Sequence, residues 1–457
     1  MLLIANAAAH AETHEYYVTV SDDMQRLSVE AHFVEPVTSI RARSSDAYRF
    51  LVDPRRCDTN ERIRVRSGRM QIPTEGIDCI RYDVDLQRAA RSERRNQVLA
   101  ESNIVVSPAD WFWRPSLRGN NDIAVHFDMS DSMYVFVPWQ VMPGHDNAFV
   151  LSDSPESSAA PAVFGKFQYA EREIAGATLR ITLLQPEGDI DTDNLFDWVA
   201  SAANNVTLAY GRFPNPSPSV LVLPVGDGWD PDASVHFGRV IRDGGETVEL
   251  MINENRPVAE YYDNWTATHE FSHLMLPYIR RPHRWVSEGF ASYYQNMLLA
   301  RAGHYSEQRA WQKLWEGLER GRQSRPDLSP NEAGRGGIRT ALMKVYWSGA
   351  SIALMADVEL RERSGGTESL DTVLEKLQAC CLPADRKWTG TELFEKLDTF
   401  VDEPVFMPLY RRYANSDGFP DARPLLARLG VDVSGRRVRF DDAAELADIR
   451  KALTTAP

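Results

Sequence analysis

The stretch His269-Glu270-Phe271-Ser272-His273 decides how the rest of the chain is interpreted. The apolar residues around it predict a helix over 264–276 that ends before Pro277. Two imidazoles one turn apart lie on the same helix face, so their nitrogens can converge on a single small cation. Neutral imidazole suits tetrahedral zinc, and the spacing therefore predicts one Zn²⁺ ion bound by His269 and His273.

The acidic residue of this stretch has a separate role. Glu270 follows the first imidazole directly, so it can reach a metal-bound water without binding the metal itself. Zinc lowers the pKa of such a water from 15.7 to about 7. A neighbouring carboxylate can then accept the proton while the oxygen attacks a carbonyl carbon. We therefore predict that Glu270 is a general base.

A third metal ligand is suggested by a second predicted helix, over 285–301. Its carboxylate Glu288 can complete a set of three protein ligands that leaves a fourth position for water. The 14 residues between His273 and Glu288 include two prolines and are long enough for the second helix to fold back on the first. Without this ligand, two solvated histidines on a surface helix would be the alternative interpretation.

The order of these motifs resembles the gluzincin metallopeptidases, the group that includes aminopeptidase N and the glycyl aminopeptidases. A helix predicted over 340–363, with the segments 357–366 and 369–374, resembles the glycyl aminopeptidases in particular. The resemblance implies a zinc peptidase acting on peptides, with Tyr346 as a catalytic residue. The Tyr346 phenol would donate a hydrogen bond to the oxyanion of the tetrahedral intermediate.

Some features depart from that family. The connector between His273 and Glu288 is shorter than usual, and we expect a relative without the family's PDZ module. The Gly-x-x-Glu strand that holds the free amine of the substrate is not clearly matched, because 237–241 has Val240 in place of the glutamate and Glu246 is off by one. An aminopeptidase-like zinc metallopeptidase is the prediction. An endopeptidase, a non-peptide amide or ester hydrolase with the same centre, and a non-catalytic peptide-binding relative remain open.

The whole chain is predicted to be an α+β multidomain protein. Residues 12–185 contain short alternating apolar segments and predict a β-rich, sandwich-like domain. Residues 186–305 are predicted to be a catalytic domain of strands and helices, and 306–457 a helical region that completes the active site. The resemblance implies a thermolysin-like architecture for the catalytic part. A strand near 247–252 is expected to be the sheet edge against which a peptide binds.

The first residues and the net charge of the chain indicate where the protein is found and which partners are disfavoured. Residues 1–11 are small and apolar and end in an A-x-A pattern, which indicates the remnant of a signal peptide. We therefore expect a periplasmic or secreted protein. The 51 basic and 65 acidic residues give a net charge of −14, which disfavours nucleic acid as a partner. No apolar run is long enough for a membrane span, and the oligomeric state is not predicted.

Two sets of residues have open alternatives. Cys57 and Cys79 could bridge a hairpin, whereas the adjacent Cys380 and Cys381 could pack, pair elsewhere or stay reduced. The basic segment 280–284 could form a rim of the cleft that binds a carboxylate, or it could be a solvated loop.

Overall fold

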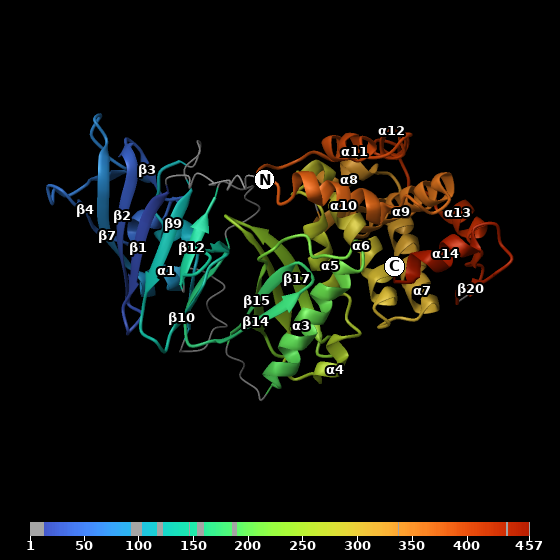
Figure 1. Cartoon of the computed structure of the whole chain (residues 1–457), viewed down its shortest axis with the longest axis horizontal. Coiled ribbons are helices and arrows are strands. Elements are labelled where there is room, and N and C mark those ends of the chain that lie inside the picture. The colour runs from blue at the N-terminus through green and yellow to red at the C-terminus, as the bar shows by residue number, and fades with distance from the viewer. Residues whose placement is uncertain are drawn as a thin grey trace, which may run out of the picture. The chain divides into compact units, whose positions relative to one another are not determined.

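The structure is a computed structural model that describes residues 13–92, 103–116, 122–145, 147–152, 160–184, 190–336, 338–435 and 437–456. The predicted signal remnant over 1–11 lies outside these residues. The chain forms two compact units, which we describe separately. Unit 1 comprises 1–169, 182–187 and 241–247, and unit 2 comprises 170–181, 188–240 and 248–457. The chain is thus a mixed α/β protein of more than one compact part, as predicted (Figure 1).

Unit 1 is built mainly of strands. They are β1 (His14–Val20), β2 (Arg26–Val37), β3 (Ile40–Arg41), β4 (Leu51–Arg56), β5 (Val65–Arg66), β6 (Arg69–Met70), β7 (Ile77–Asp85), β8 (Asn103–Val106), β9 (Ile123–Asp128), β10 (Tyr134–Phe136), β11 (Gln140–Val141), β12 (Ala148–Leu151) and β13 (Ala162–Gly165). The short helices are η1 (Ala47–Arg49), α1 (Leu86–Ser92) and α2 (Pro108–Trp111). The strands form one seven-stranded sheet in the order β11-β12-β9-β1-β2-β7-β4 and two three-stranded sheets.

The core of unit 1 follows from the alternation of its strands. Along β2, apolar residues such as Leu27 and Val29 are buried while their neighbours are exposed, because successive side chains point to opposite sheet faces. The buried side chains of the seven-stranded sheet share one core with Phe164 of β13 and with Trp111 and Trp113. One face of the large sheet is therefore packed, and the other faces solvent.

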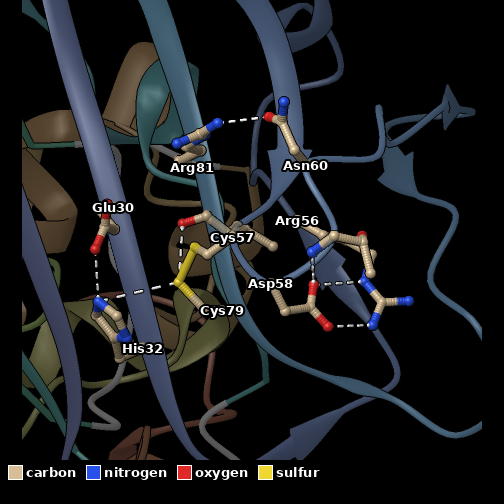
Figure 2. The surroundings of a disulfide bond; sticks show 10 residues. Glu30, His32, Arg56, Cys57, Asp58, Asn60, Cys79 and Arg81 are labelled. Atoms are coloured by element: carbon tan, nitrogen blue, oxygen red, sulfur yellow. Dashed lines mark hydrogen bonds and ion pairs between the residues drawn. A yellow bond between two sulfur atoms is a disulfide. The ribbon is translucent and has the colours of Figure 1, made fainter.

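Both cysteine pairs are disulfide-bonded. Cys57, which follows β4, is bonded to Cys79 of β7, so this bridge joins two neighbouring antiparallel strands. Figure 2 shows that Cys79 lies beside His32, whose Nε2 atom is 2.8 Å from a carboxylate oxygen of Glu30. Cys380 and Cys381 are bonded to each other at the end of α10 (Leu370–Cys381).

Unit 2 contains most of the helices. They are α3 (Thr192–Thr207), α4 (Val258–Tyr261), α5 (Thr266–Ser272), η3 (His273–Met275), η4 (Arg281–His283), α6 (Arg284–Arg301), α7 (Glu307–Gln323), α8 (Pro330–Gly336), α9 (Ile338–Ser364), α10, α11 (Gly390–Asp398), α12 (Phe406–Tyr413), α13 (Arg423–Arg428) and α14 (Ala447–Thr454). Two short strands, β19 (Val431–Asp432) and β20 (Arg439–Phe440), pair near the end of the chain. No helix within the described ranges is long and apolar enough to cross a membrane.

A five-stranded sheet completes the architecture, in the order β14-β15-β16-β18-β17. Its strands are β14 (Gln168–Ile174), β15 (Ala177–Leu183), β16 (Ser219–Pro224), β17 (Val235–Arg242) and β18 (Glu246–Ile252). In Figure 1 these strands are drawn in green beside α3. The prediction that 247–252 forms the edge of this sheet is wrong. Strand β17, which is joined to β18 by the three residues 243–245, lies on the outer side of β18 and is itself the edge strand.

Candidate metal centre and active site

Two helices bring the predicted metal ligands together. His269 lies in α5, His273 begins the turn of 3₁₀ helix η3 that continues α5, and Glu288 lies in α6. The Oε2 atom of Glu288 is 3.5 Å from Nε2 of His269 and 3.4 Å from Nε2 of His273. The ligand atoms of these three residues all lie within 4.8 Å of one another. The structure therefore places all three predicted ligands around one point.

Contacts of the Nδ1 atoms orient both imidazole rings so that their Nε2 atoms face that point. Nδ1 of His269 is 2.8 Å from the amide oxygen of Gln295, which accepts a hydrogen bond, so Nδ1 carries the proton and Nε2 presents a lone pair. Nδ1 of His273 is 2.9 Å from the hydroxyl of Ser287. Gln295 and Ser287 were not predicted from the sequence, although both lie on the helix of Glu288 and Gln295 follows it by about two turns.

The residues fit a metal ion. Nε2 of His269 and Oε2 of Glu288 are buried and have no hydrogen-bond partner among the described residues. Burial alone would raise the pKa of Glu288, but the adjacent imidazoles of His273 and His269 hold this pKa well below its ordinary value. Two imidazole nitrogens, from rings whose Nδ1 atoms have polar partners, and one carboxylate oxygen form the donor set of a catalytic zinc site.

The predicted base is packed against a glycine of the outer strand. Glu270 is 7% exposed, and burial raises the pKa of its carboxyl above the ordinary value. The backbone amide of Val240 donates a hydrogen bond to this carboxyl. A Cβ on Gly238 would lie 2.5 Å from Cγ of Glu270 and 2.9 Å from Cγ2 of Thr266, so only glycine fits there. Strand β17 thereby fixes the position of Glu270 at the centre.

Tyr346 approaches the same centre from α9. Its ring is stacked on the ring of His269, with the centroids 5.6 Å apart and the planes at 8°. Burial, together with the charges of Glu288 and Glu270 and a hydrogen bond to Glu288, raises the pKa of the Tyr346 phenol. The phenol therefore stays protonated and is available as a hydrogen-bond donor.

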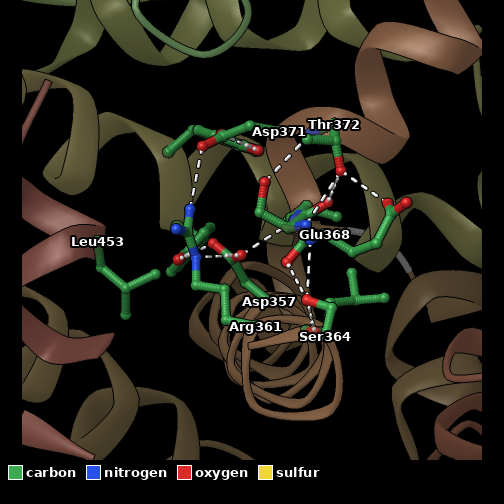
Figure 3. Close-up of polar contacts among 12 residues, drawn as sticks. Asp357, Arg361, Ser364, Glu368, Asp371, Thr372 and Leu453 are labelled. Atoms are coloured by element: carbon green, nitrogen blue, oxygen red, sulfur yellow. Dashed lines mark hydrogen bonds and ion pairs between the residues drawn. The ribbon is translucent and has the colours of Figure 1, made fainter. Parts of the chain in front are cut away.

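A buried polar network holds α6 against α9 and α10. Tyr293 donates to Asp357 at 2.7 Å, and Tyr294 donates to Asp371 at 2.8 Å. Arg361 bridges the two carboxylates, at 2.9 Å from Asp357 and 3.2 Å from Asp371. Figure 3 labels three residues of this network, Asp357, Arg361 and Asp371. The network fixes the helix that carries Glu288, because each buried charge has an opposite partner.

The network also includes the C-terminal helix. Arg301, in the last turn of α6, lies 2.9 Å from Asp371 and donates from Nε to the carbonyl of Leu453 in α14 at 3.0 Å. Both Arg301 and Asp371 are buried. Residues from distant parts of the sequence therefore meet behind the candidate site.

The carboxylates near the predicted amine-binding strand have other partners. Val240, at the position where the resemblance led us to expect a glutamate, carries no carboxylate. Glu249 of β18 accepts two hydrogen bonds from Arg239 of β17, at 2.7 and 2.8 Å. Glu246 is paired with Arg242 at 2.8 Å. Neither glutamate of this hairpin has an unpaired carboxylate for a terminal ammonium group.

Comparisons with known proteins give one family match. The family model described as M61 glycyl aminopeptidase matches residues 279–333, which include Glu288 but not His269, His273 or Tyr346. A search of the curated proteins found no match.

Solved structures share the fold at low sequence identity. An aminopeptidase N family protein from Idiomarina loihiensis is 15% identical, with a TM-score of 0.64, over 92% of this chain and 78% of that chain. The M1 zinc metallopeptidase from Deinococcus radiodurans is 13% identical, with a TM-score of 0.52, over 90% and 96%. A mutant of that enzyme bound to the peptide Tyr-Ser-Ala has a TM-score of 0.50 at 13% identity, over the same shares.

The fold, the matched segment and the clustered side chains define a hydrolase of the metallopeptidase class. Within this class, the chain resembles the glycyl aminopeptidases and the aminopeptidase N group.

Proposed function

We propose that the protein is an exported zinc metallopeptidase of the gluzincin type, which hydrolyses peptide bonds in an aminopeptidase-like reaction. The observation that carries this proposal is the convergence of His269, His273 and Glu288 on one point, with Glu270 and Tyr346 beside it. We also propose that unit 1 is sandwich-like and that unit 2 has a thermolysin-like catalytic part. The likeness in fold to an aminopeptidase N family protein supports this architecture.

His269, His273 and Glu288 would hold the zinc ion. When bound, zinc supplies a Lewis acid and lowers the pKa of water to about 7. The buried Glu270 carboxylate accepts the proton of the attacking water and can return it to the leaving amine. Tyr346 donates its phenolic hydrogen to the oxygen of the attacked carbonyl as negative charge develops there. Gln295 and Ser287 keep the imidazoles in position.

The substrate would be a peptide in extended conformation along β17. This strand is the outermost of the five, and its residue Gly238 touches the base Glu270. An exposed strand edge can pair with an extended chain through main-chain hydrogen bonds. The mutant Deinococcus enzyme, which has a similar fold, was solved with a tripeptide, and this supports a peptide as the substrate class.

A second candidate function is hydrolysis of internal peptide bonds or of non-peptide amides by the same centre. The pairing of Glu246 and Glu249 with arginines favours it, because it leaves no carboxylate on this hairpin to bind a free amine. A non-catalytic peptide-binding relative is the third candidate, and the presence of Glu270 and Tyr346 at the centre argues against it.

Zinc quantification in the purified protein, followed by assays with N-terminally blocked and unblocked peptides, tests these candidates. We expect one zinc ion per chain and cleavage of unblocked peptides. Equal cleavage of blocked peptides would select the endopeptidase. Glu270→Gln is expected to retain zinc and to lose turnover at least about a hundredfold. Unchanged turnover in this variant would remove Glu270 from the mechanism.

A further inference from the structure

Arg284 stands one helical turn before Glu288 on α6. Residues four apart on a helix lie on the same face, so Arg284 is on the face that carries the metal ligand. The first turn of α6 therefore places Arg284 on the same side of the centre as Glu288.

The environment of Arg284 differs from that of the other arginines close to the site. Arg239, Arg301 and Arg361 each have a carboxylate partner within 3 Å. Arg284 is partly buried, its Nε atom is fully buried, and this atom has no hydrogen-bond partner in the described chain. Its neighbour Glu288 directs Oε2 to the two histidines instead.

A partly buried cation without a counter-ion is costly, because desolvation of the charge is not offset by an attraction. The cost is recovered when an external anion binds. A guanidinium presents several N–H donors in a planar fork that matches a carboxylate. The residue therefore has the chemistry of a carboxylate-binding group that is completed by a ligand.

Further positive charges lie on the segments around Arg284. Arg280, Arg281 and Arg335 are exposed and form no ion pair within the described residues, and the charge of Arg335 contributes to a lowered pKa of His283. Arg335 belongs to α8, which packs on η4 through Gly334 and Pro282. This region is locally basic although the chain carries a net charge of −14, and it would attract an anionic substrate group.

We propose that Arg284 binds a carboxylate of the substrate and makes the enzyme prefer peptides with a carboxylate close to the scissile bond. This inference rests on the proposed peptidase function. The carboxylate is either the C-terminal group of a short peptide or an aspartate or glutamate side chain. Specificity would then come from a carboxylate of the substrate, since the hairpin β17–β18 offers no unpaired carboxylate to bind the N-terminal ammonium group.

Matched peptides separate the two sources of the carboxylate. The zinc-loaded protein is assayed with a short neutral peptide as free acid and as C-terminal amide, and with amidated peptides that contain Glu or Gln beside the cleaved bond. In one of the two pairs, we expect wild type to cleave the peptide with the carboxylate about 10- to 100-fold better in kcat/KM than its neutral counterpart, mainly through a lower KM. Arg284→Gln is expected to abolish this preference, and Arg284→Lys to restore part of it. Arg437→Gln removes an exposed arginine and should keep the preference.

A binding measurement keeps the inference separate from the proposed function. Zinc-loaded Glu270→Gln is titrated calorimetrically with the same peptides, which requires no turnover. Tighter binding of an acidic member, lost when Arg284→Gln is added, would support the carboxylate site even if no peptide is cleaved. Equal binding of acidic and neutral members, or a preference that persists without Arg284, would overturn it.

Discussion

Gly289 of α6 and Gly349 of α9 are in direct backbone contact. A Cβ added to Gly289 would lie 2.2 Å from Cα of Gly349, and one added to Gly349 would lie 2.0 Å from the carbonyl oxygen of Trp285. Gly289 follows the ligand Glu288, and Gly349 stands one turn after Tyr346. The closeness of the two helices is therefore what lets the phenol of Tyr346 reach the metal centre.

Gly349→Ala is expected to lower both stability and turnover. The added methyl group must push α6 and α9 apart, and overpacking of this kind typically costs about 1–3 kcal/mol. Thermal unfolding and kcat of the zinc-loaded variant measure the two effects. Gly435→Ala is the control, because the nearest atom to a Cβ at Gly435 lies 3.6 Å away. If Gly349→Ala behaves like this control, the close approach does not position Tyr346.

Gln295→Leu is expected to weaken zinc binding by about 10- to 100-fold. The substitution removes the acceptor that fixes the proton of His269 on Nδ1, and such supporting contacts typically have effects of this size on metal affinity. Competition with a chelator of known affinity measures the change. Gln323→Leu, at an exposed position of α7, should have no effect. Equal affinities in the two variants would show that His269 needs no such support.

Tyr346→Phe keeps the ring that stacks on His269 and removes only the hydroxyl. We expect kcat to fall by about a hundredfold or more, with KM and the zinc content nearly unchanged, because the donor acts on the oxyanion of the transition state. Steady-state kinetics and metal analysis of the purified variant test this. Tyr48→Phe, at an exposed tyrosine of unit 1, is the control. A variant with wild-type kcat would assign Tyr346 to packing alone.

Glu392 provides a pH-dependent test of local stability. Its carboxylate accepts the Thr389 amide at 2.6 Å in a capping box of α11, and this bond holds its pKa below the ordinary value of 4.5. A depressed carboxyl pKa stabilises the folded state above the unfolded-state value, and the contribution is lost as pH falls through the folded-state value.

Glu392→Gln should therefore unfold at a lower temperature than wild type near neutral pH, and the two should converge as the solution is made acidic. Glu395→Gln removes an exposed carboxylate from the same helix and serves as the matched control. A difference between Glu392→Gln and wild type that stays constant from neutral to strongly acidic solution would show that the charge of Glu392 does not stabilise the cap.

The sequence was most informative where chemistry depends on local spacing. The spacing of His269 and His273 specifies a shared helix face whatever the tertiary structure. Helices predicted over 285–301 and 340–363 are observed as α6 and α9 with small differences at their ends. Proximity of Glu288 to the histidines could be predicted because its helix follows after one short connector.

Features that depend on contacts between residues far apart in the sequence were harder to predict. The strand near 247–252 has the composition of any buried or edge strand, and only the sheet order shows that β17 lies outside it. Gly238 touches Glu270 across 32 positions of sequence, and nothing in its neighbours signals that contact. Gln295 did carry a signal, since a residue about two turns after Glu288 must share its helix face.

The hydrogen bond between Arg301 and the carbonyl of Leu453 makes helix α14 part of the packing that holds α6 in place. Proteolytic trimming of the final turn would leave a buried guanidinium short of an acceptor within the very helix that presents Glu288. Inactivation by such a cut would then arise without any damage to the histidines.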